Sequence, residues 1–156
     1  MNEITSEAQA RQRAALSIVL PGQIALFTDA FMLALAIYRE ARGEPMQAKI
    51  AVGCVIRSRV CWGGWYGEGW FGVITKPGQF SSFNLGDRNS VVFGTDTDPA
   101  WRDSVAAALR VMGSEPDPTA GATFYFDRSR DANPPQWASI YIHTADIGAF
   151  HFYRRL

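Results

Sequence analysis

Glu40 occupies a position in this sequence that suits acid catalysis. It follows an unbroken apolar run, Ala30 to Tyr38, which predicts a helix that is hydrophobic on every side and therefore buried. Glu40 comes three residues after Ile37 and seven after Leu33, so it projects from the face of the helix that is otherwise core. The negative end of the helix dipole and partial removal from water both favour its protonated form, which is the form a general acid needs.

A structural role for Glu40 is the competing interpretation. Carboxylates at helix ends commonly bend to solvent or form ion pairs, and Arg39, Arg42 or a distant arginine could serve as the partner. The residues alone leave both roles open.

The limits of this helix are predicted from its flanking residues. Thr28 or Asp29 can cap its start through a side-chain oxygen. Gly43 stands where a left-handed residue often ends a helix, and Pro45 prevents simple continuation. We therefore expect the helix to end near Arg42.

Five short blocks follow one another along the chain: REARGEP, QAKIAVGCVIRSRV, KPGQFSS, GATFYF and IGAFHFY. In order and spacing they resemble the spore cortex-lytic and cell-wall hydrolase family of the SleB type, from about Ala30 to Tyr153. The resemblance implies a lysozyme-like α+β fold, with a mainly helical body around a buried central helix and a small antiparallel sheet. It also implies a lytic transglycosylase that cleaves peptidoglycan between N-acetylmuramic acid and N-acetylglucosamine, with Glu40 as the catalytic acid and then base.

Further residues are expected to bind the glycan. In the KPGQFSS block, Gln79 could hold the sugar or the catalytic carboxyl group, and Phe80 anchors the segment. Ser81 of the same block is also expected to bind substrate. Tyr125, on an expected strand, could donate a hydrogen bond near the acid or simply fill the sheet.

Two aromatic loops are also candidates for sugar binding. The segment Trp62 to Phe71 has four glycines and five aromatic residues, a composition that no regular element favours. Exposed aromatic rings such as Trp65 can stack on the apolar faces of sugars, although these rings could equally cover the core. Trp137 stands at the tip of a second, proline-rich loop and is expected to act in the same way.

A hydrolysing muramidase, which would need a second carboxylate, is an alternative function. The candidates for that group are Glu44, Glu68, Asp87 and Asp127. Glu44 lies closest to Glu40 in sequence and is expected to be structural or accessory, pairing with Arg42. A third possibility is a peptidoglycan-binding module without catalytic activity.

No metal and no cofactor are expected. His143 and His151 lack a third ligand at a suitable spacing, so we interpret them as hydrogen-bonded structural residues. Cys54 and Cys61 fall seven residues apart in one expected helix, roughly 10 Å along its axis, which predicts free thiols.

The remaining elements are predicted from turn and capping residues. A second helix should begin with Pro45 as its first residue and stop at Gly63, and a third should begin at Asp98 and Pro99 with Val105, Leu109 and Met112 on one face. A strand is expected over 121–127, and a hairpin over 140–153 with its turn at 146–148.

Composition indicates one globular domain over 1–156, without a separate wall-binding domain. The 15 basic residues balance 15 acidic ones, so no electrostatic footprint for nucleic acid exists, and no stretch is long and apolar enough for stable membrane insertion. We read residues 14–27 as a helix and turn packed on the core rather than as a signal peptide, and residues 1–13 as a frayed extension.

This organisation predicts a monomer that is made in the cytoplasm and acts on the cell wall after export or membrane breach. A short domain of this kind resembles a phage or prophage endolysin.

Overall fold

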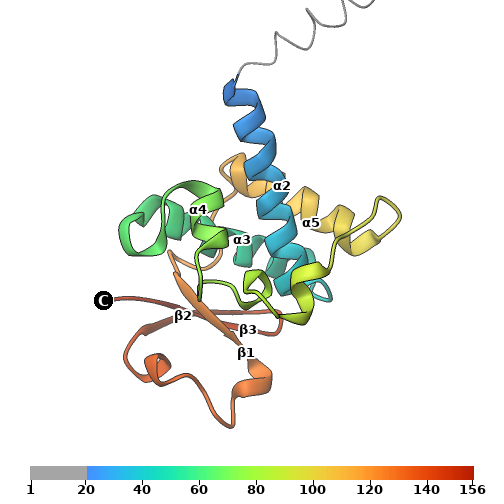
Figure 1. Ribbon diagram of the computed structural model, residues 1–156. Helices are drawn as coiled ribbons and strands as arrows, with labels where there is room; N and C mark the ends of the chain where they lie inside the picture. The colour runs from blue at the N-terminus through green and yellow to red at the C-terminus, as the bar shows by residue number, and fades with distance from the viewer. Residues whose placement is uncertain (1–20) are drawn as a thin grey trace, which may run out of the picture.

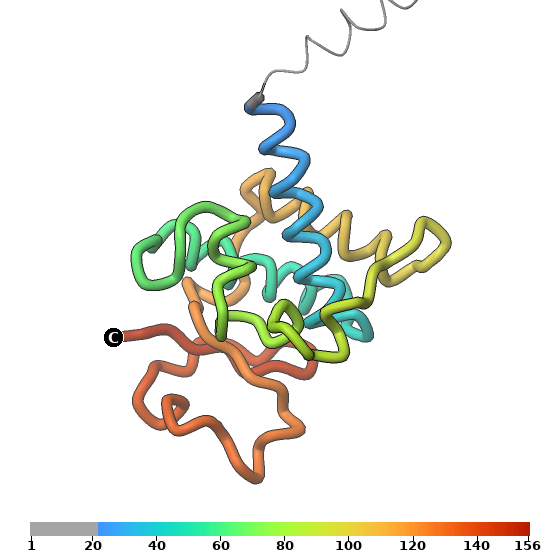
Figure 2. The backbone as a smooth tube through the Cα atoms, viewed as in Figure 1, coloured from blue at the N-terminus to red at the C-terminus, as the bar shows by residue number. Residues whose placement is uncertain are grey.

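The computed structural model describes residues 21–156, which form a helical body with a small sheet against one side (Figures 1 and 2). Its α-helices are α2 (Pro21–Ala41), α3 (Met46–Trp62), α4 (Gly69–Thr75) and α5 (Pro99–Met112). Its strands are β1 (Phe124–Asp127), β2 (Ile142–Ile147) and β3 (Phe150–Arg154). Short 3₁₀ turns are η1 (Gly64–Tyr66), η2 (Ser81–Phe83), η3 (Arg88–Val91), η4 (Arg128–Arg130) and η5 (Gln136–Ser139).

The sheet is antiparallel, with strand order β1-β3-β2. Tyr125 of β1 and Ala145 of β2 both face Phe152 of the middle strand across the sheet. The β2–β3 turn contains Gly148, whose φ of 59° is in the left-handed region that glycine adopts easily. The predicted strand and hairpin are therefore confirmed, as is the predicted fold class.

Helix α3 lies deepest in the protein. Its residues from Ala48 to Ile56 are buried on every side of the helix, because α2, α4, α5 and the sheet surround it. The sheet is seated on α3 through Phe152, which belongs to the same apolar cluster as Val52 and Val55. In α2, by contrast, complete burial is confined to Leu33–Tyr38 and Ala41. The sequence prediction chose α2 as the buried central helix, and α3 fills that position more completely.

Helix α2 begins earlier than predicted. It runs without a break from Pro21, and Thr28 donates its side-chain hydroxyl to the carbonyl of Ile24 inside the helix. The expected cap at Thr28 or Asp29 is therefore wrong. Proline fits the first turn because its missing N–H would have no partner there, so the helix can start upstream of the apolar run.

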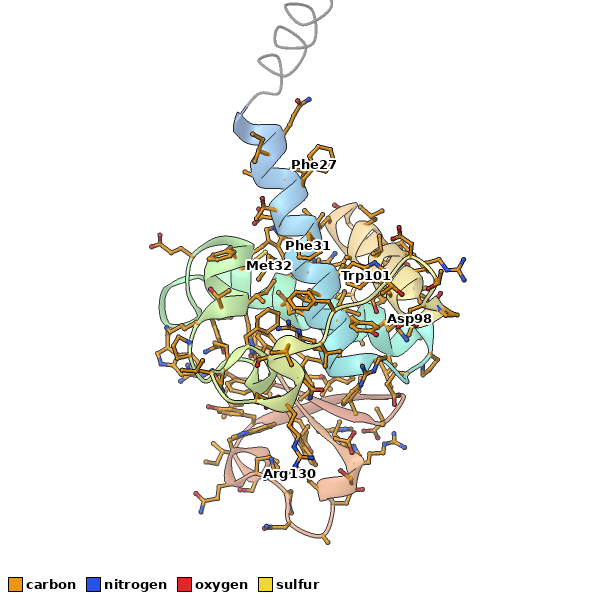
Figure 3. The ribbon with its side chains drawn as sticks, turned by 45° about the vertical axis from the view of Figure 1, so that its right-hand side comes forward. Phe27, Phe31, Met32, Asp98, Trp101 and Arg130 are labelled. Atoms are coloured by element: carbon orange, nitrogen blue, oxygen red, sulfur yellow. The ribbon has the colours of Figure 1, made fainter. Side chains whose placement is uncertain are left out.

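The N-terminal part of α2 extends away from the helical body. Phe27 is 72% exposed, and its side chain projects into solvent in Figure 3. The expectation that the segment before the central helix packs on the core is wrong for residues 22–27. Residues 14–20, and the extension expected over 1–13, lie outside the described part of the chain.

The end of α2 is closed by a buried lysine. Gly43 is not in the left-handed region, so its predicted role is wrong. Instead Lys49, which is buried in α3, donates its ammonium group to the carbonyls of Arg42 and Glu44. A side-chain cation satisfies the carbonyls just past the helix end and suits the negative end of its dipole. Pro45 precedes α3 as its N-cap residue rather than as its first residue.

Helix α5 begins as predicted and then holds α2. The Asp98 carboxylate accepts the Ala100 amide hydrogen at 2.8 Å, while its other oxygen accepts the Tyr38 hydroxyl at 2.5 Å. Trp101 packs edge-on against Tyr38 and Phe31 (Figure 3).

The core face of α5 differs from the predicted one. It carries the small residues Ser104, Ala107, Ala108 and Val111, which let α2 and α3 approach closely. Of the residues predicted on that face, Val105 and Met112 are partly buried against the core, whereas Leu109 is 59% exposed. None of the helices in residues 21–156 is both long enough and apolar enough to cross a membrane.

Candidate active site

The carboxyl group of Glu40 is held by hydroxyl groups from two other elements. Glu40 is half-buried in the last turn of α2. The Ser82 hydroxyl, in η2, donates to Oε1 at 2.6 Å, and the Tyr125 hydroxyl, on β1, donates to Oε2 at 2.9 Å. Each carboxylate oxygen therefore has a fixed partner, one from the helical body and one from the sheet.

Arg39 fixes the segment that carries Ser82. Its guanidinium donates to the carbonyls of Ser82 at 3.1 Å, Ser90 at 2.8 Å and Val92 at 3.0 Å. It also lies over the ring of Phe83, at 4.6 Å from the centroid. These contacts tie η2 and η3 to the end of α2. Arg39 therefore positions Ser82, which in turn donates its hydrogen bond to Glu40.

Tyr125 is fixed by the sheet. Its ring packs against Phe150 and Phe152 of β3. Burial, followed by the nearby Glu40 carboxylate, raises the pKa of the Tyr125 phenol well above its ordinary value. The hydroxyl therefore stays protonated and donates its hydrogen to Glu40 across the neutral range.

A groove of about 650 Å³ contains Glu40 and runs between the helical body and the sheet. All six residues predicted to bind substrate line it, together with Glu40: Trp65, Gln79, Phe80, Ser81, Tyr125 and Trp137. Trp65 is largely exposed, and Trp137 is stacked against Tyr141 and packed against Phe124. The groove thus combines aromatic surfaces with polar groups, which suits a carbohydrate.

Arg59 lines this groove, and the sequence prediction missed it. It is 6% exposed, donates to the Thr123 carbonyl at 2.8 Å and lies over the Phe80 ring at 4.8 Å. Burial lowers the pKa of its guanidinium, while the nearby Tyr125, Tyr66 and Glu40 act in the opposite direction. A signal did exist, because Arg59 follows Val52 and Val55 at the helical spacing of a buried face.

Ser82 was also missed, although its neighbour Ser81 was chosen. Ser81 is exposed and lines the groove, whereas Ser82 is 1% exposed and bonds directly to Glu40. Adjacent residues in a 3₁₀ turn point in different directions, and the sequence does not say which one faces the acid.

Of the candidate second carboxylates, Asp127 lines the groove and the other three do not. Its Oδ1 accepts the Ser129 amide hydrogen at 2.7 Å, and hydrogen bonds from Ser129 lower the pKa of the carboxyl group. Asp87 caps η3 by accepting the Asn89 amide hydrogen, and Glu68 is exposed at the start of α4.

Glu44 joins two turns outside the groove. Its Oε2 accepts the Ala149 amide hydrogen at 2.8 Å, so it holds the β2–β3 turn against the α2–α3 turn. The expected pairing with Arg42 is replaced by this bond to a backbone amide.

The Trp62–Phe71 segment divides between the two roles considered for it. Tyr66 is buried in the core, and Trp70 packs against that core, whereas Trp62 and Trp65 are exposed. The prediction that this segment has no regular structure is wrong, because η1 and the first part of α4 lie within it.

His143 of the edge strand β2 and His151 of the middle strand β3 share a carboxylate. His143 Nε2 lies 2.8 Å from Asp146 Oδ1, and His151 Nδ1 lies 2.5 Å from the same oxygen. His151 Nε2 also lies 3.0 Å from Asp131 Oδ1. These contacts match the predicted interpretation of hydrogen-bonded structural histidines. The expectation that these histidines lack a third ligand-type group is wrong, because one such atom from each of His143, Asp146 and His151 lies within 4.8 Å of the others.

The cysteines are free, as predicted. Cys54 is buried in α3 and Cys61 is exposed near its end. Burial raises the pKa of the Cys54 thiol to about 11, so this residue is an inert part of the core.

Comparison with known proteins identifies the family. The profile of the Cell Wall Hydrolase family matches residues 43–153, from just after Glu40 to the last strand. The chain belongs to the cell wall hydrolase family. This cell wall hydrolase is 33% identical over 99 residues to a spore cortex-lytic enzyme of Halalkalibacterium halodurans, and 29% identical over 130 residues to one of Bacillus subtilis. The two matches cover 64% and 83% of the chain but only 27% and 39% of those relatives.

Solved structures agree with this assignment. The catalytic domain of the germination-specific lytic transglycosylase SleB from Bacillus anthracis superimposes with a TM-score of 0.64 at 28% identity, covering 81% of this chain and 93% of that domain. The catalytic domain of Bacillus cereus SleB gives a TM-score of 0.59 at 28% identity, covering 81% and 89%. The resemblance and the fold class expected from the sequence are confirmed.

Proposed function

We propose that this cell wall hydrolase is a lytic transglycosylase that cleaves the glycan strand of peptidoglycan between N-acetylmuramic acid and N-acetylglucosamine, with Glu40 as its acid and base. The observation that carries the proposal is the hydrogen-bonded carboxyl group of Glu40 in an aromatic-lined groove. The similarity to a catalytic domain named as a lytic transglycosylase supports the reaction type.

In the first step Glu40, in its protonated form, gives its proton to the glycosidic oxygen as the bond from that oxygen to C1 of muramic acid breaks. Positive charge develops on the sugar ring, and Glu40 becomes a carboxylate. Ser82 and Tyr125 each donate a hydrogen bond to that carboxylate, which stabilises the negative charge.

In the second step the Glu40 carboxylate accepts the proton of the C6 hydroxyl group of the same muramic acid. The C6 oxygen then forms a bond to C1, which gives a 1,6-anhydro ring and returns Glu40 to its protonated form. No water is consumed, so one carboxyl group suffices for the whole cycle.

The groove residues have proposed roles in substrate binding. Trp65 and Trp137 provide ring faces for stacking on sugars, while Gln79 and Ser81 provide polar groups for sugar hydroxyls and the N-acetyl group. Phe80 is buried and holds its segment against Arg59.

Hydrolysis with Asp127 as the second carboxylate is the alternative function. It is favoured by the position of Asp127 in the groove and by the lowered pKa of its carboxyl group, which keeps it ionised at neutral pH. An ionised carboxylate there could stabilise the charged sugar or activate water.

Cleavage in heavy-oxygen water separates the two functions. Hydrolysis transfers one solvent oxygen to the new reducing end, whereas the transglycosylase reaction transfers none. We expect no label in the product, and Asp127→Asn should retain most of the wild-type rate. Labelled products together with an inactive Asp127→Asn variant would establish the muramidase instead. Binding to insoluble peptidoglycan without release of soluble products would indicate a non-catalytic module.

We further propose that residues 21–156 act as one catalytic unit in monomeric form, in the setting of phage or prophage lysis. Sedimentation of the purified protein tests the monomer. Lysis of cells that make the protein only when their inner membrane is also permeabilised tests the setting.

A further inference from the structure

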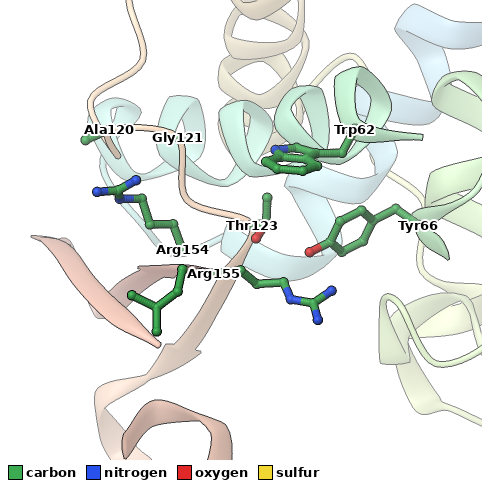
Figure 4. Close-up of a pocket in the computed structure, with 8 residues that line it drawn as sticks. Trp62, Tyr66, Ala120, Gly121, Thr123, Arg154 and Arg155 are labelled. Carbon is green, nitrogen blue, oxygen red and sulfur yellow. The ribbon is translucent and has the colours of Figure 1, made fainter. Parts of the chain in front are cut away.

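A second hollow of about 400 Å³ lies beside the end of the sheet, and Glu40 does not line it (Figure 4). Its walls come from the end of α3, from η1, from the segment before β1 and from the end of β3. The residues that matter to the argument are Trp62, Tyr66, Thr123, Arg154 and Arg155. We call this hollow the arginine pocket.

Two buried hydroxyl groups point into the arginine pocket. Tyr66 is 4% exposed and Thr123 is 3% exposed, and Figure 4 shows both hydroxyls turned towards the space between Trp62 and Arg155. Within residues 21–156 neither hydroxyl has a hydrogen-bond partner. Folding does not normally leave such groups unpaired, because each loses its hydrogen bonds to water without replacement. Each oxygen exposes less than 1 Å², so a ligand in the pocket would supply those partners once the two side chains turn towards it.

The charge of the arginine pocket selects a negative ligand. Arg154 and Arg155 line it, and among the described residues no aspartate or glutamate does, although Leu156, the last residue of the sequence, lines it as well. In the described part of the chain, neither arginine forms an ion pair. A guanidinium group and neighbouring hydroxyls match the two oxygens of a carboxylate, and the exposed indole of Trp62 offers an apolar surface beside them.

The arginine pocket and the catalytic groove are lined by residues that are neighbours in sequence. Tyr66 follows Trp65 and Thr123 precedes Phe124, and both Trp65 and Phe124 line the groove. Arg59, which also lines the groove, donates to the carbonyl of Thr123. A substrate with a side branch could therefore occupy both hollows at once.

We propose that the arginine pocket binds a free carboxylate of the peptide that branches from muramic acid. This inference rests on the proposed function, because it takes peptidoglycan as the substrate. In peptidoglycan the lactyl carboxyl group of muramic acid is joined to the peptide by an amide bond, so the free carboxylates of the intact polymer belong to the peptide. The hydroxyls and the arginines would then bind the peptide, a part of the substrate that takes no part in the cleavage reaction.

Binding of the isolated acidic stem tetrapeptide to the full chain, measured by calorimetry, tests the proposal. This peptide has no glycosidic bond, so the measurement does not depend on cleavage. We expect the wild type to bind the peptide and to bind its fully amidated form at least about tenfold more weakly. Binding of glycan strands freed of peptide is measured in the same way, because the lactyl group of these strands is also a free carboxylate.

Three variants complete the experiment. Arg155→Gln and the double variant Tyr66→Phe, Thr123→Val should each weaken peptide binding about tenfold or more, whereas the charge-matched control Arg102→Gln, at an exposed position on α5, should not. The double variant should melt at or above the wild-type temperature, because it removes two buried hydroxyls that have no partner. If it does not fold, Arg155→Gln alone decides, because that side chain is exposed.

Equal affinity for the acidic and amidated peptides, or unchanged binding by Arg155→Gln, would overturn the proposal. Preference for the stripped strands over the peptide would also overturn it, in favour of the lactyl carboxylate. A wild type that cleaves glycan but does not bind the peptide would contradict only the pocket, whereas peptide binding without cleavage would contradict only the proposed function.

Discussion

The hydroxyl oxygen of Ser82 lies 2.6 Å from Oε1 of Glu40, although 42 positions separate the two residues in sequence. Tyr125 holds Oε2 from the opposite wall, 85 positions away. The orientation of the carboxyl group is therefore set where the helical body meets the sheet, and not by α2 alone. The Glu40 carboxyl group is therefore oriented only when the sheet is packed against the helical body.

Removing either hydroxyl should slow cleavage. Ser82→Ala and Tyr125→Phe each take away one hydrogen bond that stabilises the Glu40 carboxylate, so kcat should fall by about 10-fold to 100-fold with little change in KM. Release of soluble glycan at several substrate concentrations measures both constants. Ser139→Ala and Tyr141→Phe are matched controls outside the Glu40 contacts. Wild-type kcat in both site variants would show that the two hydrogen bonds are irrelevant to the reaction.

Arg39 should be irreplaceable by lysine. A lysine keeps the charge but cannot donate to three carbonyls while lying over Phe83, so Arg39→Lys should lose about 2 kcal/mol of unfolding free energy. Amide hydrogen exchange should also speed up over residues 82–93, and cleavage should slow. Arg42→Lys, at an exposed position over the Tyr38 ring, is the control. Equal stability of the two variants would argue against the anchoring role of Arg39.

Glu44 should affect stability and not chemistry. Its carboxylate accepts the Ala149 amide hydrogen, and a glutamine retains an acceptor oxygen at the same position. Glu44→Gln should therefore cleave glycan at close to the wild-type rate, while Glu44→Ala should lose about 1–2 kcal/mol of unfolding free energy. Denaturant titration and the cleavage assay check the two effects. A Glu44→Gln variant that folds normally but is inactive would place Glu44 in the reaction itself.

Stability should depend on the ionisation of Asp146 in acid. Hydrogen bonds from His151 and then His143 lower the pKa of the Asp146 carboxyl group below its ordinary value of 3.8. The ionised form therefore stabilises the folded state. This contribution is complete above pH 3.8 and is lost as the pH falls through the lower folded value.

The Asp146→Asn variant checks this prediction. Its unfolding free energy should fall less steeply than that of the wild type below about pH 4, because it has no carboxylate to protonate at this position. Asp103→Asn, at an exposed position on α5, should keep the wild-type slope. Because His151 also contacts Asp131, the comparison reports on the link between the sheet and the loop that carries Trp137. Parallel curves for all three proteins would contradict the prediction.

Local sequence patterns predicted much of the fold. Asp98 and Pro99 marked the start of α5, and the alternation around Gly148 marked the hairpin, because capping and turn chemistry act between near neighbours. The predictions were wrong where a residue distant in sequence, rather than a capping or turn residue nearby, determines the structure. The end of α2 depends on buried Lys49 rather than on Gly43. The sequence pattern of α2 does not predict the hydrogen bond from Lys49 to the Arg42 carbonyl.

The candidate site shows the same division. The sequence placed Glu40, Tyr125 and the KPGQFSS segment together, and the groove contains Glu40, Tyr125 and residues 78–81 of that segment. It did not separate Ser81 from Ser82, because that choice depends on the direction of a 3₁₀ turn. It also overlooked Arg59, whose burial is possible only because Thr123 and Gln79 supply carbonyl oxygens from other elements.

Mass analysis of the soluble glycans released from purified peptidoglycan by the wild type and by Glu40→Gln tests the central claim most directly. The glutamine keeps the size of the side chain but has no proton to give, so the variant should fold and melt like the wild type while cleavage falls by at least about 10²-fold. The wild type should release products one water lighter than ordinary muropeptides. A folded Glu40→Gln variant that still releases these products at the wild-type rate would contradict the assignment of Glu40 as the acid.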